Sequence, residues 1–410
     1  MYKRQGFAYD LTGQGKTVIR GGFGTMYERI QGNDMYNGAV NPPGDVNPTL
    51  NNVSLSNPGF NLQNGSTITS AALPVLPAGI SGINANNYKL PVSYQFSAGV
   101  QQALGARSVL SLSYVGSQDR HQNDYEEINL PSQSLLPALV AAGGAGLNQD
   151  MTYLGYGGIK QAENEANAHY NSFQTDLHAN LRSDLQAEFG YTYSKAIDAT
   201  TSNGSGGDLN NATNPYVGWR YDVGPSQFDR TNIAFVNFVY QIPFLKNSDN
   251  HLMKSTVGGW EVSGIVTMES GAPLNLGVSG NNVASVVPNS GNRPELTGSI
   301  SYPKTAAEWF NPAAFSAPAP GTYGNLGFDA IRGPGRDDWN LSLFKSFVIS
   351  EARGSRFEFR AESFNTWNHT QFKGDANNGG IGTSVGSGNF GVVSAAFDPR
   401  EFQLGAKLIF

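Results

Sequence analysis

The amino-acid sequence predicts an all-β protein, an antiparallel transmembrane β-barrel with about eleven strands in its 410 residues. Segments of about ten residues alternate apolar and polar side chains, which is the period of a β-strand. The connections between these segments alternate between short and long, as periplasmic turns and outer loops do in bacterial outer-membrane barrels. Aromatic residues collect near the segment ends, where such barrels contact the two membrane interfaces.

Composition excludes several other classes of protein. Charged residues make up only 14% of the chain and aromatic residues 11%, which does not suit a helical domain. The net charge of −6 and the lack of a basic run argue against a nucleic-acid partner. Without cysteine there are no disulfides or thiolate metal sites. The sequence contains no run of about 18 consecutive apolar residues, which a membrane-spanning helix would need. If the chain spans a membrane, it must therefore do so as a β-barrel.

The predicted strands are longer than those of soluble proteins. Most have about nine to twelve residues, against the usual five or six, and about ten residues cross a bilayer at a tilt. A soluble β-sandwich also alternates apolar and polar residues. However, nothing in a sandwich requires short and long connections to alternate along the chain. In chain order the predicted strands are residues 3–10, 16–27, 94–102, 108–117, 173–181, 185–193, 231–242, 260–269, 339–347, 356–363 and 402–410.

The connections predict which end of the barrel faces outward. The long ones are rich in Asn, Gly, Ser and Pro, which indicates irregular surface chain rather than a packed core. Residues 135–145 could add a short loop helix. The short set is residues 11–15, 103–107, 182–183, 243–256 and 348–354, and the long set is 28–91, 118–168, 195–230, 270–338 and 365–399.

Charged residues in the strands indicate which face lines the lumen. Arg356, Glu358, Arg360 and Glu362 alternate with apolar residues in one strand. Because an Arg facing lipid at mid-depth costs about 2 to 4 kcal/mol, we expect these residues, and Arg20, to face the lumen. An odd set of eleven strands cannot close as a bacterial barrel. The sequence is therefore expected to be an incomplete, open or half barrel, eleven strands of twenty-two.

Several segments resemble the Oar-like branch of the TonB-dependent outer-membrane receptors, and together they cover nearly the whole chain. The resemblance lies in their order and spacing. They are RGGFGTMYER (20–29), the stretch from NAHYNSFQTDL (167–177) to FGYTYSKAID (189–198), FDRTNIAFVNFVYQIPF (228–244), WFNPAAFSAPAPGTYGNLG (309–327), RGPGRDDWNLSLFKSF (332–347), FEFRAESFNTWNHTQF (357–372) and DPREFQLGAKLIF (398–410).

This resemblance implies that residues 1–410 are the C-terminal part of a receptor barrel, without the plug, the TonB box and the N-terminal regulatory-like domain. The complete protein would take up a scarce ligand, such as a siderophore, vitamin, oligosaccharide or peptide, in an energised process. Its implied partners are outer-membrane lipid, TonB through the missing N-terminal part, and the barrel assembly machinery, which would read Phe410 as a terminal signal. The lumen charges would pair with one another and contact the plug.

No enzymatic motif in the sequence has the flanking structure that its chemistry requires, and no cofactor is expected. Gly382, Ser384 and Gly386 match a nucleophile elbow but lie in a Gly-rich loop. The Gly15-Lys16-Thr17 run is better explained by a hairpin turn than by a phosphate loop. The histidines, His178 included, lack paired zinc spacing. The Asp/Asn stretches 208–214 and 375–378 lack the ligand order of a calcium loop.

Aromatic residues of the long loops are the candidate ligand contacts, because their faces can stack on sugars or aromatic chelators. Loops that fold over these rings are an equally good explanation. The corresponding hypotheses are an outer-membrane transporter and, alternatively, a surface anchor or adhesin whose loops bind partners without transport. The candidates are Tyr216, Trp219, Trp309, Tyr323 and Trp367.

Overall fold

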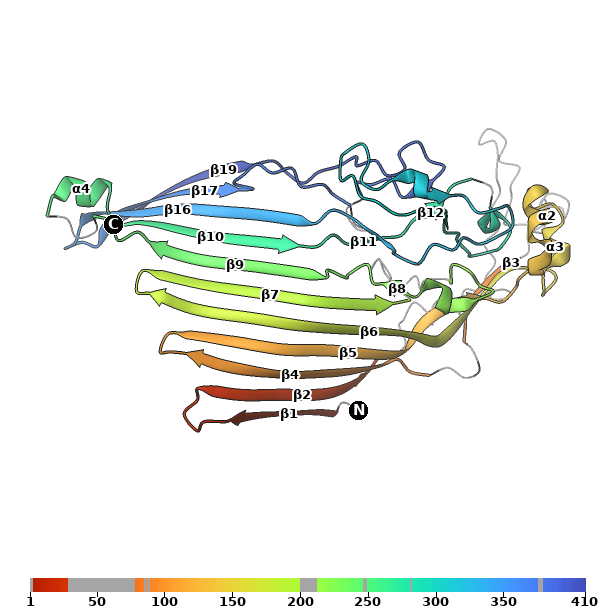
Figure 1. The fold of residues 1–410 in the computed structure, drawn as a ribbon, viewed down its shortest axis with the longest axis horizontal. Helices are drawn as coiled ribbons and strands as arrows, with labels where there is room; N and C mark the ends of the chain where they lie inside the picture. The colour runs from red at the N-terminus through yellow and green to blue at the C-terminus, as the bar shows by residue number, and fades with distance from the viewer. Residues whose placement is uncertain are drawn as a thin grey trace, which may run out of the picture.

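One large antiparallel sheet dominates the computed structural model (Figure 1), which describes residues 3–28, 78–84, 86, 89–199, 212–245, 249–280, 282–374 and 379–410. Eleven of its strands form an up-and-down path in which each strand pairs with the next along the sheet. They are β1 (Lys3–Asp10), β2 (Thr17–Tyr27), β4 (Val92–Leu104), β5 (Ser108–Glu127), β6 (Tyr156–Arg182), β7 (Leu185–Asp198), β9 (Asn232–Gln241), β10 (Trp260–Glu269), β16 (Arg336–Ser350), β17 (Ser355–Phe364) and β19 (Glu401–Ile409).

The predicted all-β meander of eleven strands is confirmed. Among the described residues, β1 and β19 each pair with a single neighbour, so the sheet stays open. Within that part of the chain no helix is long and apolar enough to cross a membrane.

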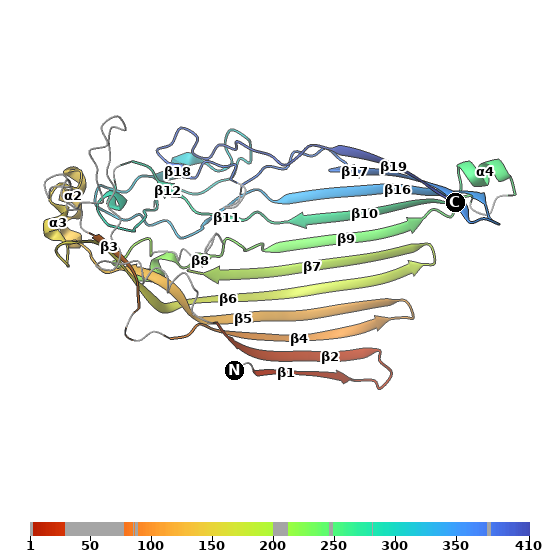
Figure 2. The same ribbon diagram turned by 180° about the vertical axis from the view of Figure 1, so that it is seen from behind.

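The sorting of short and long connections is also confirmed. At one end of the sheet, together with the C-terminus, lie connections 11–16, 105–107, 183–184 and 351–354 and the described residues of 242–259 (Figures 1 and 2). The described residues of the long connections gather at the opposite end. They carry the helices α2 (Leu136–Ala141) and α3 (Leu147–Asp150), the 3-10 turns η1 (Gln133–Leu135), η2 (Gly218–Asp222), η3 (Val283–Ser285) and η4 (Pro312–Ala314), and the short strands β11 (Pro273–Leu274), β12 (Gly277–Val278), β13 (Glu295–Leu296), β14 (Phe315–Ser316), β15 (Ile331–Arg332) and β18 (Ser384–Val385).

The prediction that residues 118–168 form one irregular loop is wrong. β5 and β6 continue well beyond the other strands, and they pair as far as Glu127↔Lys160, with register shifts near residues 119–124. Two further strands join this region: β3 (Ala78–Asn84) pairs parallel with β6, and β8 (Gly224–Pro225) pairs with β7. The sequence showed no alternation here because polar and apolar residues such as Asp124, Tyr125 and Glu127 are all buried under the loops.

The eleven paired strands are called the strand wall below. Their register assigns every residue of the wall to one of two faces, since directly paired residues share a face. One face is polar: Glu358 lies opposite Ser346 and Lys407, and Glu188 opposite His178 and Asn237. The other face presents large apolar side chains that remain exposed. In water such a surface would be an association patch, whereas in a barrel it contacts lipid. Examples are Phe7, Phe23, Tyr114, Phe173, Phe189, Tyr193, Phe402, Leu404 and Leu408.

Glycines on the apolar face make room for aromatic rings on the neighbouring strand. A Cβ added at Gly21, Gly116 or Gly264 would lie 2.5 to 2.6 Å from a ring atom of the directly opposite phenylalanine. Each ring therefore covers backbone that would otherwise contact lipid, a packing that also supports glycines in designed sheets. The pairs are Phe7 with Gly21, Phe96 with Gly116, and Phe238 with Gly264.

Lys345 is a charged residue on the apolar face, near the short-turn end. Its side chain is buried, and its ammonium group donates to the backbone carbonyls of Thr256 (3.0 Å) and Gly258. Thr256 ends helix α4 (His251–Thr256) and Gly258 follows it, whereas the sequence predicted residues 243–256 as a turn. The helix end thus satisfies a charge that the apolar face could not solvate.

The long loops contain a packed core, so the prediction of irregular surface chain is wrong for the described loop residues. The first cluster has Phe310 and Ile331 at its centre, and the rings of Phe310, Phe315 and Phe390 pack edge to face at 5.2 to 5.8 Å. The second cluster packs α2 against η3 through Leu136, Leu139, Val140, Val283, Val286 and Val287. The apolar residues of these clusters are scattered among Gly, Asn, Ser and Pro. They therefore have no regular spacing in the sequence from which a packed core could be predicted.

Candidate ligand-binding surface in the outer loops

The turn η2 places Trp219, Arg220, Tyr221 and Asp222 consecutively in the long loops, and of these only Trp219 is a candidate from the sequence. Asp222 anchors the turn through a buried ion pair with Arg293, at 2.6 Å. The Arg293 guanidinium also donates to the carbonyls of Tyr221 (2.6 Å) and Leu326 (3.0 Å) and lies 3.7 Å from the centre of the Tyr221 ring. Arg293 thereby fixes both the backbone and the ring that follow Trp219.

Burial raises the pKa values of two carboxyl groups in the long loops, those of Asp222 and Asp329. It raises the pKa of Asp222, and the Thr213 amide and Arg293 oppose that rise. Asp329 is buried, and neither of its carboxylate oxygens has a hydrogen-bond partner among the described residues. Burial, and next the charge of Asp198, raise the pKa of Asp329 to about 7. The loop layer is therefore built around a carboxyl group that resists ionisation.

Three tyrosines form a cluster next to the ion pair. The Tyr323 ring packs edge to face against Tyr216 at 6.3 Å and against Tyr221 at 6.0 Å. The Tyr216 hydroxyl donates to the Pro131 carbonyl at 2.8 Å, and burial raises the pKa of Tyr216 to about 12. These phenols stay protonated at neutral pH. A cavity of about 470 Å³ opens beside Tyr221 and Tyr323.

A second, smaller cavity of about 220 Å³ lies beside Trp219 and Arg220, with Lys89 and His121 also on its wall. Among the described residues, the Trp219 indole N–H and the side-chain oxygen of Asn164 have no hydrogen-bond partner, although both atoms are buried. A buried water molecule is the common partner of such atoms.

The remaining loop aromatics lie elsewhere. Trp309 is 8% exposed within the first loop cluster, and its indole N–H donates to the Arg332 carbonyl at 2.8 Å. Trp367 is 64% exposed and packs edge to face on Trp339 at 6.0 Å, where β17 ends. The structure thus brings together Tyr216 and Tyr323 and places Trp219 on the adjoining turn. Sequence interpretation missed Tyr221, Asp222 and Arg293, because only tertiary contact joins residues 71 positions apart.

The charged residues that the sequence predicts on the lumen side lie on the polar face of the wall. Arg356 pairs with Glu358 at 2.7 Å and Arg360 with Glu362 at 3.7 Å. Arg20 lies on the same face, opposite Ala8 and Gly99. A groove of about 630 Å³ runs along this face, from β6 to β17. Phe410, at the end of the last strand, is 96% exposed.

The short motifs noted in the sequence lie in a short strand, in a hairpin turn and partly outside the described residues. Ser384 lies in the two-residue strand β18 beside β12, and no helix follows it within the described residues 379–410. Gly15-Lys16-Thr17 lies at the β1–β2 hairpin, where the Gly15 amide donates to the Asp10 carboxylate at 2.6 Å. The stretch 375–378 and most of 208–214 lie outside the described residues.

Comparison with known proteins identifies the architecture. One family model, described as an outer membrane beta barrel domain, matches residues 4–403. Among solved structures, the outer membrane transporter YddB from Escherichia coli is similar, with a TM-score of 0.50 at 10% identity, over 97% of this chain and 39% of that one.

Two more solved structures are similar at lower TM-scores. The ferric-catecholate import receptor Fiu from E. coli gives 0.41 at 11% identity, over 98% of this chain and 34% of that one. The siderophore receptor PiuA from Acinetobacter baumannii gives 0.41 at 8% identity, over 98% and 35%. The chain therefore spans between a third and two fifths of the length of these structures. A search of curated proteins finds no match.

Proposed function

The chain belongs to the family of outer membrane beta barrel domains, and from this premise we propose that it forms wall and outer loops of a transport receptor in the bacterial outer membrane. The observation that carries the proposal is the cavity of about 470 Å³ beside Tyr221 and Tyr323. Ligand pockets commonly measure about 300 to 1,000 Å³. The buried Asp222–Arg293 pair holds the Tyr221 side of this cavity in place. A preorganised cavity loses little entropy when a ligand binds.

We further propose that the wall is the C-terminal half of a 22-stranded, TonB-dependent barrel of the Oar-like branch. The seven resembling segments and the two open sheet edges support this assignment. An unpaired strand edge in hydrocarbon costs several kcal/mol for each unsatisfied group, so each edge requires a partner strand. The plug and the TonB box would then belong to the rest of the receptor.

The ligand class follows from the chemistry of the cavities. Tyrosine rings stack on sugars or aromatic chelators, and Lys89 and Arg220 place positive charge on the wall of the smaller cavity beside Trp219. A siderophore, vitamin, oligosaccharide or peptide meets these requirements. The proposed contacts are Tyr216, Trp219, Tyr221 and Tyr323. Trp309 and Trp367 are set aside, because the first is enclosed and the second lies apart on Trp339.

An uptake assay tests this proposal. Cells with and without the protein are compared for removal of ferric siderophores, cobalamin, oligosaccharides and peptides from the medium, before and after collapse of the proton gradient. We expect removal of one class, dependent on the gradient, and at least a tenfold loss with Tyr221→Ala or Tyr323→Ala, but not with Trp367→Ala. Binding that is independent of the gradient would favour the surface anchor instead.

A further inference from the structure

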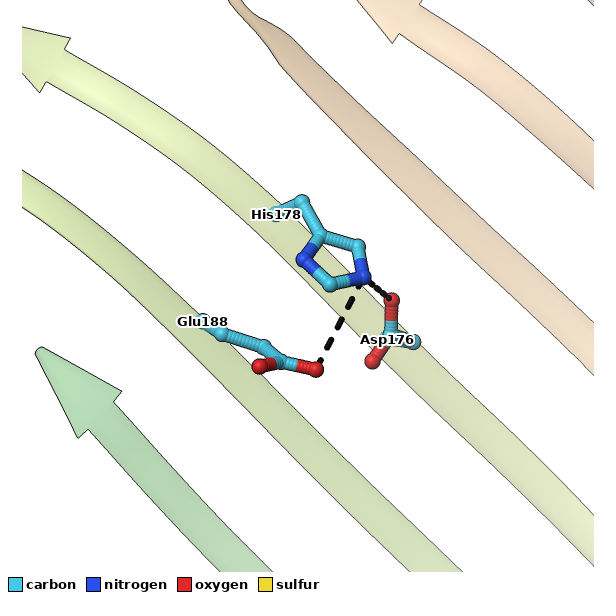
Figure 3. A group of neighbouring side chains, drawn as sticks. All are labelled: Asp176, His178 and Glu188. Carbon is cyan, nitrogen blue, oxygen red and sulfur yellow. Dashed lines mark ion pairs between the residues drawn. The ribbon is translucent and has the colours of Figure 1, made fainter. Parts of the chain in front are cut away.

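Three potential metal ligands converge on the polar face of the β6–β7 hairpin (Figure 3). The His178 Nε2 atom lies 3.1 Å from Asp176 Oδ1 and 3.6 Å from Glu188 Oε1. All three ligand atoms lie within 4.8 Å of one another. One imidazole nitrogen and two carboxylate oxygens thus point at a common centre from two paired strands.

The hairpin itself creates this arrangement. Asp176 and His178 are two residues apart on β6, so they share a face, and Glu188 is the direct cross-strand partner of His178. The turn at residues 183–184 fixes that pairing. The histidines lack the usual zinc-motif spacing, but an Asp-x-His segment with Glu at the paired hairpin position becomes recognisable once the turn is known.

The spacing fits a small, tetrahedrally coordinated cation. Zn²⁺ binds His nitrogen and carboxylate oxygen at about 2.0 to 2.2 Å, so neighbouring ligand atoms of a tetrahedron lie about 3.4 Å apart. The two separations from His178 Nε2, 3.1 and 3.6 Å, bracket that value. Ca²⁺ and Mg²⁺ prefer oxygen-only sites with six or more ligands, whereas imidazole suits Zn²⁺ and Cu²⁺.

The surroundings support binding in two ways. The Asn237 amide donates to the second oxygen of Glu188 at 3.3 Å and so orients the carboxylate, as partners of metal ligands commonly do. His178, Glu188 and Asn237 also line the groove of about 630 Å³. The His178 side chain is 62% exposed to this groove, which leaves room for water or another ligand on a bound ion.

We propose that Asp176, His178 and Glu188 bind one divalent first-row transition-metal ion, such as Zn²⁺ or Cu²⁺, on the wall of this groove. The ion replaces the His178 ion pairs, since a neutral imidazole coordinates through the nitrogen that now faces the carboxylates. The proposal does not depend on the identity of the transported ligand, because it rests on the hairpin alone.

Isothermal titration with Zn²⁺ tests the site in protein purified from outer membranes in mild detergent. We expect one Zn²⁺ per chain, and at least a tenfold weaker affinity in His178→Gln and in Glu188→Gln. Asn237→Ala should weaken binding about tenfold, the lower end for loss of such a partner. His169→Gln is the matched control, because it removes an imidazole from the same strand, nine positions away, and should leave binding unchanged.

Electron paramagnetic resonance of bound Cu²⁺ gives a readout that a purely structural role of His178 would not produce. The wild-type spectrum should show coupling to one imidazole nitrogen, and His178→Gln should lose it while the heat-modifiable band shows an intact barrel. Unchanged Zn²⁺ affinity in the His178→Gln and Glu188→Gln variants would overturn the proposal. Absence of any Zn²⁺ binding by folded wild-type protein would overturn it as well.

Discussion

The strand wall and the outer loop layer are stabilised in opposite ways. The wall has regular backbone pairing and keeps its large apolar side chains on the surface, where Leu404 is 73% exposed. The loop layer has little regular structure, yet both apolar clusters of the described residues lie there, with Phe310 and Leu136 fully buried. In a membrane wall, lipid takes the place of a core, whereas the loops face water and must build their own.

Loss of a core ring should have the largest effect and should separate the two regions. Phe310→Ala removes a ring in contact with Phe315 and Phe390, and such a change costs about 3 to 5 kcal/mol. We expect the loops to become protease-sensitive while the heat-modifiable band of the wall persists. Leu404→Ala, on the lipid face, is the control and should leave the loops resistant. Equal sensitivity in both variants would erase the proposed contrast.

The two regions also contain contrasting ion pairs. Arg293→Ala leaves Asp222 buried without its partner, which typically costs about 3 to 5 kcal/mol. Arg356→Ala breaks a half-exposed pair with Glu358, for which about 1 kcal/mol or less is expected. Denaturant titration followed by limited proteolysis of the loops measures both. A loss of similar size in the two variants would mean that burial does not decide the strength of these pairs.

Assembly of the wall should depend on its last residue. We propose that Phe410, which is almost fully exposed, is read by the barrel assembly machinery. Phe410→Asp should therefore lower the amount of folded protein in the outer membrane several-fold. Ile409→Asp, at the adjacent position on the polar face, is the control and should have a smaller effect. Quantifying the heat-modifiable band compares the two, and equal loss would indicate that the end of β19 acts through packing alone.

The stability of the loop layer should depend on pH through Asp329. The folded pKa of Asp329 is raised from 3.8 to about 7. Between these values the folded state binds more protons than the unfolded state, so the stability of the loop layer falls as pH rises from about 4 to about 7. Protease resistance of the loops should decrease over this range, and Asp329→Asn should flatten the decrease. A profile that stays steep in this variant would assign the effect to another group.

The smallest perturbation tests the facing of the wall. Spin labels at Phe359, Leu404 and Leu408 should contact lipid, and labels at Glu358, Arg360 and Gln403 should be shielded from it, because the register assigns these sets to opposite faces. Lipid-soluble and water-soluble relaxation agents measure the difference with little effect on stability. The reverse accessibility would contradict the register.

The candidate site was only partly predictable from the sequence. Tyr216, Trp219 and Tyr323 were expected as loop aromatics, and the structure places them on or beside the two outer cavities. Tyr221 and Arg293 were missed, because a cation that stacks on a ring 72 positions away leaves no local pattern. Trp309 looked similar in sequence to the other aromatics, and only the surrounding residues of the first cluster show that it is enclosed.

The sequence by itself determined the wall: its eleven strands, their alternating faces and the sorting of the connections to two ends. A strand wall is predictable because its pairing is between neighbours and its period of two repeats along each segment. Tertiary structure alone decided the extension of β5 and β6, the two loop clusters, the Asp222–Arg293 pair and the convergence of Asp176, His178 and Glu188. Such features depend on which distant segments exclude water together, and that depends on the folded arrangement rather than on any local repeat.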